Sequence, residues 1–340
     1  MSFPQSSLKS SVKSSLDLAF ILDPLPKLKI EKDSSVAMMA AATARGHRLF
    51  ACEQRQISLS RGQVVGDFVE LTLTGESPAW YRTGPPVERP LADFGAVLMR
   101  KDPPFDVEYL YSTYLLEHAS RQGARVINEP RAVRDNNEKY SITEFPALTT
   151  EVLVTRDPVR LRAFVAEHQE AVLKLLDGMG GASIFRVRID DPNLSVILET
   201  MNEFGTRTVM AQKYLPAIAA GDKRILLIGG EVVPYSLARV PRRGESRGNL
   251  AAGGTGHAQP LSARDREIAE SLAPILLSRG LFLVGLDVIG DNLTEINVTS
   301  PTCFREIADQ TGFDVADLFI TRLEARVAGA AGGITPVPDA

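Results

Sequence analysis

Three oxygen-bearing side chains near the C-terminus have the spacing of a metal site. The turn Gly290-Asp-Asn292 separates two apolar, strand-like runs between Val284 and Val298, which predicts a β-hairpin. Counting outward from residue 291 gives three cross-strand pairs: Ile289 with Leu293, Asp287 with Glu295, and Gly285 with Asn297. Because side chains alternate between the two faces of a strand, Asp287, Glu295 and Asn297 then share one face.

Two carboxylates that face each other repel unless a cation lies between them. Oxygen ligands of this kind suit Mg²⁺, which also takes water and the phosphate oxygens of a nucleotide, and Mn²⁺ is a second candidate ion. Gly285 leaves room for a bulky group against the sheet. The hairpin therefore predicts a metal site, and a polar, solvent-facing strand without an ion is the alternative.

A lysine followed by a glycine-rich turn lies further upstream. Lys174 belongs to an apolar run, and Asp177-Gly-Met-Gly-Gly181 follows it. Backbone N–H groups of such a loop can approach phosphate oxygens closely, and the lysine supplies a positive charge. Lys139 could add a second charge. The pattern favours a phosphate-binding loop, and a plain glycine-rich hairpin between two strands fits it equally well.

Six basic residues lie on a predicted hairpin and on the loop after it: Lys223, Arg224, Arg239, Arg242, Arg243 and Arg247. Arg224 and Arg239 interrupt otherwise apolar strands, where unpaired charged residues are rare. Arginines at such positions could neutralise substrate carboxylates or a transferring phosphoryl group. Arg242 and Arg243 are expected on a solvated face.

Strands and helices that position these residues can be predicted from apolar periodicity. In the first part of the chain, strands are expected at 16–22, 48–53, 96–99 and 125–128, and helices at 34–45 and 107–121. Such alternation argues for a parallel α/β sheet. Beyond residue 153 the pattern changes to short strands, a hairpin at 224–238, and helices at 263–279 and 315–327. A domain boundary is expected between residues 130 and 140.

Three segments are expected to lack regular structure. Residues 1–15 are rich in serine and have no apolar periodicity, which predicts a disordered tail, and residues 331–340 are expected to fray. The stretch from Gly244 to Gly256 holds five glycines and few bulky side chains. It is therefore expected to be a mobile loop that closes over a site.

Composition excludes several classes of protein. The 340 residues are 44% hydrophobic, and 38 Lys+Arg against 42 Asp+Glu give a net charge of -4, which disfavours a nucleic-acid partner. No apolar run approaches the ~18 residues of a membrane span. The two cysteines, Cys52 and Cys303, match no metal or redox spacing, so a reducing cytoplasm is expected.

Together these segments resemble the ATP-grasp ligases, and within that superfamily the bacterial glutathione synthetases. The resemblance covers about residues 16–325. It is strongest in five strings: Lys32-Asp-Ser-Ser35, Met99-Arg-Lys-Asp-Pro-Pro-Phe-Asp106, Asp177-Gly-Met-Gly-Gly-Ala-Ser-Ile-Phe-Arg186, Arg247-Gly-Asn-Leu-Ala-Ala-Gly-Gly254 and Thr294-Glu-Ile-Asn-Val-Thr-Ser-Pro-Thr302.

The fold implied by this resemblance is mixed α/β and α+β. An N-terminal parallel α/β (pre-ATP-grasp) domain that binds substrate, residues 16–135, would precede a two-subdomain ATP-grasp fold, residues 136–330. The latter would divide into a central lid at about 140–215 and a C-terminal subdomain at about 216–330. A homo-oligomer, specifically a tetramer, is also implied.

The resemblance further implies a role for each matching residue. ATP would be bound by Lys139, Lys174, Gly178, Met179, Gly180, Gly181, Gln212, Lys213, Tyr214, Leu215 and Asp222. Arg224 and Arg239 would be catalytic, through contact with acyl-phosphate oxygens. The peptide substrate would be bound by Arg247, Asn249, Ser300, Pro301 and Thr302, and the metal by Asp287, Glu295 and Asn297.

The implied reaction joins γ-L-glutamyl-L-cysteine to glycine and converts ATP to ADP and phosphate, with an acyl phosphate as intermediate. Two alternatives remain: an ATP-grasp ligase for another carboxylate and amine, and a nucleotide-binding protein without turnover. Lys139, Lys174 and the three metal ligands occur together, which disfavours a silent site. The match at Arg247–Gly254 and Ser300–Thr302 favours the glutathione-forming reaction.

Overall fold

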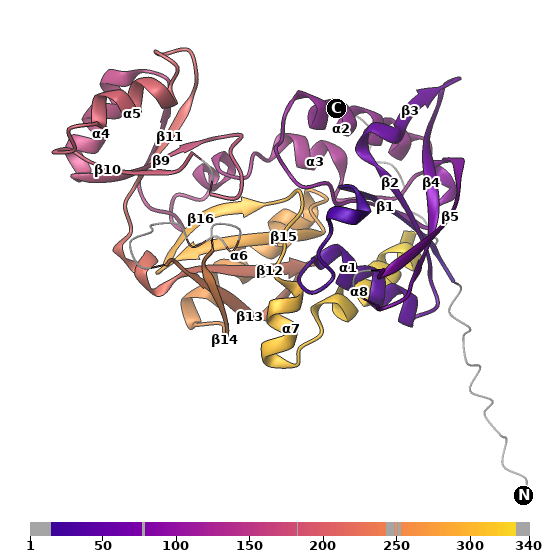
Figure 1. Cartoon of the computed structure of the whole chain (residues 1–340). Helices are drawn as coiled ribbons and strands as arrows, with labels where there is room; N and C mark the ends of the chain where they lie inside the picture. The colour runs from indigo at the N-terminus through magenta and orange to yellow at the C-terminus, as the bar shows by residue number, and fades with distance from the viewer. Residues whose placement is uncertain are drawn as a thin grey trace, which may run out of the picture.

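The computed structural model describes residues 15–76, 79–181, 183–242, 248, 250 and 253–330. Within them the chain forms three β-sheets with helices packed around them (Figure 1). Three of the predicted features lie outside these residues: the tail 1–15 apart from Ser15, the tail 331–340, and the substrate residues Arg247 and Asn249. The predicted loop 244–256 falls mostly outside the described residues, and its last residues, 255–256, belong to a strand.

The N-terminal sheet is parallel at its centre, as predicted, and antiparallel at one side. Its strand order is β3-β4-β2-β1-β6-β7, with β5 paired to β4. Strands β2, β1, β6 and β7 run parallel, whereas β3, β4 and β5 pair antiparallel. The elements of this region are β1 (Asp17–Leu22), α1 (Ser34–Ala44), β2 (Arg48–Glu53), β3 (Ile57–Ser60), β4 (Gln63–Leu73), β5 (Tyr81–Pro90), β6 (Ala96–Met99), α2 (Val107–Arg121), β7 (Val126–Ile127) and α3 (Pro130–Asp135).

Local sequence explains where the first helices begin. The Asp33 carboxylate accepts hydrogen bonds from the backbone N–H groups of Ser35 and Val36, which caps α1. Asp106 caps α2 in the same way through the N–H of Tyr109. The structure confirms four predicted elements to within a residue: the strands at 16–22 and 96–99 and the helices at 34–45 and 107–121.

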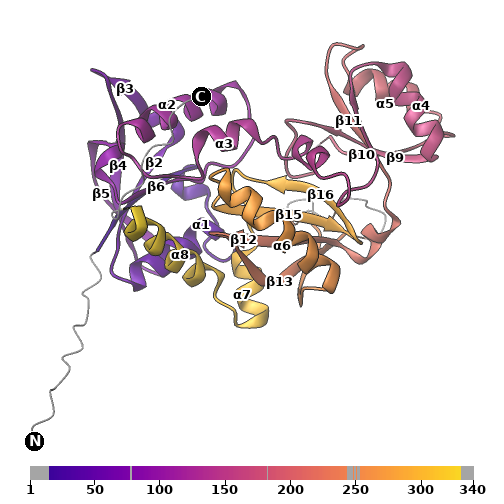
Figure 2. The ribbon, with the colours of Figure 1, turned by 180° about the vertical axis from the view of Figure 1, so that it is seen from behind.

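A four-stranded antiparallel sheet, order β10-β9-β11-β8, forms the second region. It projects from the rest of the molecule in both ribbon views (Figures 1 and 2). Its own core is built from residues such as Leu161, Leu173 and Leu198. The elements are β8 (Val152–Thr155), α4 (Pro158–His168), β9 (Glu170–Leu175), β10 (Phe185–Arg188), α5 (Leu194–Met201) and β11 (Val209–Lys213).

The third sheet is also antiparallel and has the order β14-β13-β12-β15-β16. The predicted hairpin at 224–238 and the helices at 263–279 and 315–327 are confirmed with small shifts of their ends. The elements are β12 (Asp222–Ile228), β13 (Glu231–Val240), β14 (Thr255–Pro260), α6 (Ala263–Ser278), β15 (Leu283–Ile289), β16 (Asn292–Asn297), α7 (Phe304–Thr311) and α8 (Val315–Ala330). Short 3-10 turns are η1 (Leu25–Lys27), η2 (Gln54–Gln56), η3 (Leu91–Asp93), η4 (Tyr140–Glu144) and η5 (Pro216–Ala220).

The first and third sheets are joined by shared contacts. The buried Asn128 amide donates to the carbonyls of Leu283 and Val298, and its oxygen accepts from the N–H groups of Phe282 and Leu283. At the other side, α8 packs beside α1 (Figure 2), and Arg45 forms ion pairs with two carboxylates of α8. Helix α8 therefore packs against the N-terminal region.

Candidate active site

A pocket lies where the second sheet faces the third, and it brings together residues that are far apart in the sequence. The pocket is lined by every described residue to which the resemblance gives a role: Lys139, Lys174, Gly178, Met179, Gly180, Gly181, Gln212, Lys213, Tyr214, Leu215, Asp222, Arg224, Arg239, Asp287, Glu295, Asn297, Ser300, Pro301 and Thr302. The roles assigned to these residues remain predictions, but their proximity is a property of the fold. Two basic residues that the sequence singled out do not line it: Lys223 pairs with Asp265 of α6, and Arg242 donates to the Gly253 carbonyl.

The β15–β16 hairpin has the predicted pairs at its functional positions and a different register at its turn. Asp287 lies opposite Glu295, and Gly285 lies opposite Asn297. The predicted pair of Ile289 with Leu293 is wrong, because Ile289 pairs with Asn292 and a register shift follows Asp287. A two-residue turn thus replaces the expected three-residue one, and Thr294 is the extra residue of a bulge.

Glycine at position 285 gives space to an arginine. A Cβ at Gly285 would lie 2.9 Å from Cδ of Arg224 and 3.0 Å from Cβ of Pro301. The room that the sequence predicted against the sheet is therefore filled by the Arg224 side chain, which comes from the neighbouring strand β12.

Asp287 is the centre of a buried ion cluster. The Arg224 guanidinium donates to it through Nε at 2.5 Å and through Nη2 at 3.1 Å. Arg239 Nη2 lies 2.9 Å from Asp287 Oδ2 and 2.6 Å from Asp222 Oδ2. Two arginines from β12 and β13 thus neutralise two carboxylates.

Burial and charge act on these groups in opposite directions. Burial alone would raise the pKa of Asp287, but Arg224 and Arg239 outweigh it and hold that pKa well below its usual range. Burial raises the pKa of Asp222 to about 6, against the pull of Arg239 and with the help of the neighbouring Asp287 and Glu295 charges. Asp222 Oδ1 is also buried without a hydrogen-bond partner. It is thus the least satisfied carboxylate of the cluster.

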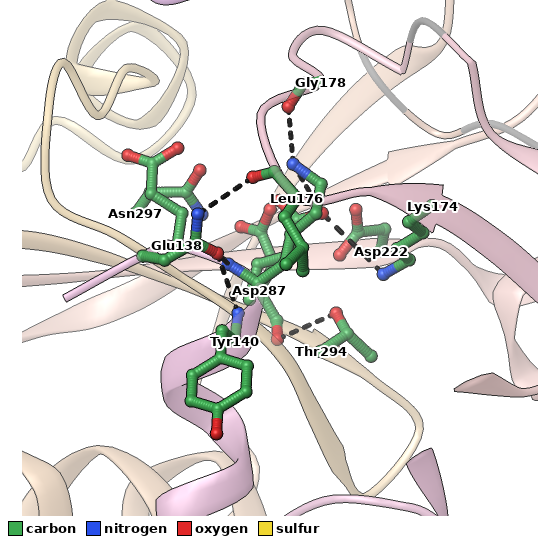
Figure 3. A network of polar contacts seen from close by, with 12 residues as sticks. Glu138, Tyr140, Lys174, Leu176, Gly178, Asp222, Asp287, Thr294 and Asn297 are labelled. Atoms are coloured by element: carbon green, nitrogen blue, oxygen red, sulfur yellow. Dashed lines mark hydrogen bonds and ion pairs between the residues drawn. The ribbon is translucent and has the colours of Figure 1, made fainter. Parts of the chain in front are cut away.

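The two predicted phosphate-binding lysines converge on Glu295. Lys174 Nζ lies 3.7 Å and Lys139 Nζ 4.0 Å from Glu295 Oε1, and both lysines are buried. Lys139 Nζ also donates to the Gly178 carbonyl of the glycine-rich loop (Figure 3). This loop joins β9 to β10, as the strand and hairpin pattern predicted.

Asn137 fastens the Lys139 segment to the same loop. Its Nδ2 donates to the Leu176 carbonyl at 3.0 Å, and its Oδ1 accepts from the N–H groups of Lys139 and Tyr140 (Figure 3). No sequence pattern predicts this role, because a single asparagine before a lysine has no characteristic spacing.

The predicted metal ligands fit Mg²⁺ by their chemistry. Asp287, Glu295 and Asn297 offer two carboxylates and an amide oxygen to one pocket. Asn297 donates through Nδ2 to the Gly285 carbonyl, which leaves its amide oxygen free to act as an acceptor. Among the described residues no group of three His, Cys, Asp or Glu side chains has the arrangement of a metal site.

The turn after β16 carries the predicted substrate contacts Ser300, Pro301 and Thr302, and it lies against the N-terminal region. Arg100 donates through Nη2 to the Pro301 carbonyl at 3.0 Å, and Ser300 Oγ donates to the Arg100 carbonyl at 3.4 Å. Sequence reasoning left several lining residues unassigned, among them Asp102, Glu138 and Thr299.

The three sheets are arranged as in the ATP-grasp fold. Among solved structures, the chain resembles D-cycloserine synthetase DcsG, with a TM-score of 0.64, 17% identity, and coverage of 92% of this chain and 99% of that one. It also resembles the ATP-grasp ligase PsnB, whose structure holds a minimal precursor, Mg and ADP, with a TM-score of 0.58, 18% identity, and coverage of 92% and 98%. At these identities the likeness concerns the fold.

Family models specify the class further. The model of the N-terminal domain of prokaryotic glutathione synthetase matches residues 16–134, and the model of its ATP-grasp domain matches residues 138–312. The chain belongs to the prokaryotic glutathione synthetase family, and its activity is that of an ATP-dependent ligase of this family.

Relatives named glutathione synthetase match nearly the whole chain. The one from Ralstonia nicotianae is 59% identical over 93% of this chain and 98% of its own length. The one from Nitrosomonas europaea is 59% identical over 92% and 99%, and the one from Pseudomonas aeruginosa is 52% identical over 92% and 99%. Within the described part of the chain, no helix is both long enough and apolar enough to cross a membrane.

Proposed function

We propose that the pocket between the second and third sheets joins γ-L-glutamyl-L-cysteine to glycine at the expense of ATP. The observation that carries this proposal is the convergence, in one pocket, of the phosphate-binding, arginine, metal-ligand and substrate positions that match the family. Relatives that are 59% identical over most of the chain are named glutathione synthetase.

In the first step the cysteinyl carboxylate attacks the γ-phosphorus of ATP, so an acyl–phosphate bond forms and ADP leaves. The reaction needs in-line positioning of ATP and compensation of negative charge, and no nucleophile of the protein. Arg224 and Arg239, on adjacent strands, supply buried positive charge to the transferring phosphoryl group. In the second step the glycine amine attacks the acyl carbon, loses a proton, and expels phosphate.

The nucleotide would lie between β9, β11 and the glycine-rich loop. Lys139 and Lys174 would hold the phosphates, and the backbone of residues 178–181 would cover them. The segment Gln212–Leu215 would line the adenosine end, where the buried Gln212 Nε2 has no partner within the protein. An amide donor of this kind suits a heteroaromatic base.

Asp287, Glu295 and Asn297 would hold Mg²⁺, with Mn²⁺ as a substitute, and the ion supplies charge compensation at the ATP phosphates. Without nucleotide the same carboxylates neutralise the cations of the site: Glu295 faces Lys139 and Lys174, and Asp287 faces Arg224 and Arg239. The binding of Mg·ATP would exchange these internal ion pairs for pairs with phosphate. Buried charges therefore keep a partner in both states.

The peptide substrate would contact Ser300, Pro301 and Thr302, together with Arg247 and Asn249 of the loop outside the described residues. We also propose the division into a substrate domain at 16–135, a lid at about 140–215 and a C-terminal subdomain at about 216–330. The tetramer and the cytoplasmic location remain predictions. Light scattering of the purified chain tests the first, and fractionation of cells tests the second.

The deciding experiment measures ADP release from the purified chain with γ-glutamylcysteine, with and without glycine, and identifies the product by mass spectrometry. We expect sustained ADP release only with both substrates and a product with the mass of glutathione. Substitution of other amines for glycine is the control. Faster turnover with another carboxylate and amine pair would assign the pocket to a different ATP-grasp ligation.

A further inference from the structure

Among the residues that the structure describes, no named strand pairs with the outer edge of β16, and the segment 138–149 covers it. Strand β16 is the last in its sheet. The N–H of Leu293 donates to the Leu148 carbonyl at 2.8 Å, and the N–H of Ile296 donates to the Glu138 carbonyl at 2.8 Å. The segment 138–149 thus satisfies backbone groups that a partner strand would otherwise satisfy.

Beyond the end of β16, a single side-chain oxygen accepts the hydrogen bonds of the next backbone N–H groups. Glu138 Oε1 accepts hydrogen bonds from the N–H of Val298 at 2.9 Å, the N–H of Thr299 at 3.1 Å and the hydroxyl of Thr299 at 2.8 Å. A carboxylate is the acceptor in all three, so each is stronger than a bond between neutral groups. Together they fix the start of the turn that leads to Ser300 and Thr302.

Glu138 connects two parts of the site through its position in the chain. The next residue, Lys139, bonds to the carbonyl of Gly178 in the glycine-rich loop (Figure 3) and lies near Glu295. The Glu138 side chain accepts hydrogen bonds from Val298 and Thr299 in the turn after Asn297. Because Glu138 and Lys139 are adjacent in the chain, the bonds of Glu138 to the turn would set the separation between the phosphates of ATP and the carboxylate that attacks them. An error of about 1 Å in such a separation can cost ~10²-fold in rate.

We propose that Glu138 is a positioning residue: it holds the turn 298–302 in register with Lys139, so that the peptide substrate and the γ-phosphate meet in line. The proposal rests on the assignment of Ser300–Thr302 to the peptide substrate made above. Glu138 acts through hydrogen bonds to the turn, and the reacting atoms are held by other residues.

The test compares Glu138→Ala, Glu138→Gln and Thr149→Val in the full chain. Alanine removes all three acceptor bonds, whereas glutamine keeps an amide oxygen at the same place. Thr149 Oγ1 donates to the Leu293 carbonyl at 2.7 Å, so its replacement by valine removes a hydrogen bond at the other end of the same strand edge, away from the pocket lining. It is therefore the matched control.

We expect Glu138→Ala to raise the KM for γ-glutamylcysteine about tenfold and to lower kcat, with the KM for ATP changed less than about threefold, because a loosened turn affects the peptide end of the site first. Glu138→Gln should recover most of both constants. Thr149→Val should lower the melting temperature and leave the kinetic constants unchanged.

Two results would overturn the proposal. One is a Glu138→Ala enzyme that melts earlier but has wild-type kcat and KM, and the other is an equal rise in the KM of all three substrates. If the alanine variant does not fold, Thr299→Val, which removes only the hydroxyl bond, must raise the KM for γ-glutamylcysteine about twofold to threefold or the proposal fails.

Ser300→Ala separates this proposal from the assignment on which it rests. A raised KM for γ-glutamylcysteine in Ser300→Ala, with wild-type kinetics in Glu138→Ala, would reject the positioning role and keep the substrate assignment. Wild-type KM in both variants would reject the substrate assignment of the turn itself.

Discussion

At the scale of single residues, the site is a set of buried charges that neutralise one another before substrate binds. Asp287 is 2% exposed, and its two arginines are buried as well. Removing such charges from water is costly unless each has a partner. The cost is offset here because both carboxylates among the predicted metal ligands have cationic partners: Asp287 pairs with Arg224 and Arg239, and Glu295 faces Lys139 and Lys174. Where one of these charged side chains is partly exposed, water can solvate a partner that loses its counter-charge. Replacing such a side chain should therefore reduce substrate binding and catalysis more than the stability of the fold.

The effect of a lost charge on catalysis can be tested at Glu295 with little damage to the fold. Glu295→Gln keeps the volume but removes a charge that would hold the metal, so we expect turnover to fall by more than about a hundredfold while the protein still folds. The measurement is ADP release together with a thermal melt. Asp291→Asn, in the exposed turn of the same hairpin, should behave as wild type. Near wild-type ADP release by Glu295→Gln at ordinary Mg²⁺ would remove Glu295 from the metal site.

Asp222 should make stability depend on pH. Its pKa in the folded protein is about 6, above the value of about 4 in an unfolded chain, so the folded state binds the proton more tightly. Its contribution to stability is complete below pH 4 and is lost as the pH rises through 6. The Asp222→Asn variant lacks this titration. The difference in melting temperature, wild type minus variant, should therefore fall between pH 4.5 and 7 and then level off, and a flat difference would refute the raised pKa.

At the scale of elements, sequence periodicity located the strands and helices whose faces differ sharply in polarity. The apolar β1 and the capped α2 were predicted to within a residue. Strand β5 was missed because it contains Pro85, Pro86 and Pro90 and is largely exposed, so nothing in its composition distinguishes it from a loop. It pairs with β4 at the edge of its sheet, where proline is tolerated.

In the site, too, contacts within one hairpin could be predicted from the sequence pattern, whereas contacts between distant segments could not. Local alternation was enough to place Asp287 opposite Glu295, but not to detect the bulge at Thr294, since a bulge depends on the turn geometry. Contacts between Lys139, Lys174 and Glu295 join three separate elements. Only the family resemblance, and not periodicity, could bring these residues together.

A prediction at this scale concerns the strand face shared by β12 and β15. Gly285→Ala places a methyl group 2.9 Å from the Arg224 side chain, so the arginine must shift away from Asp287. We expect kcat to fall about 10²-fold with a modest loss of stability. Gly84→Ala, on strand β5, is the control, because its nearest new contact would be 3.8 Å away. Unchanged kcat in Gly285→Ala would mean that the position of Arg224 is not critical.

At the scale of the whole molecule, the proposed domains correspond to the separate β-sheets, but the hydrophobic core is shared between two of them. One buried cluster combines Val97 and Leu116 of the N-terminal region with Leu272 and Val284 of the C-terminal region. A second cluster combines residues of α1 and α8. The second region has a cluster of its own, built from residues of α4, β9, β10, α5 and β11, and Met210 of β11 is its buried link to the first cluster. The first and third sheets should therefore unfold together, while the second can open alone.

Asn128 provides the test of this coupling. Asn128→Ala would leave the backbone groups of Phe282, Leu283 and Val298 buried without these partners, which should cost about 3–5 kcal/mol of stability. Because the core is shared, hydrogen exchange should become faster in both β1 and β15. Asn202→Ala is the control. The side chain of this buried asparagine bonds to Arg156 and Gly205, both in the second region, so exchange should become faster in residues 152–213 alone. Faster exchange confined to residues 16–135 in Asn128→Ala would show that the N-terminal region is an independent folding unit.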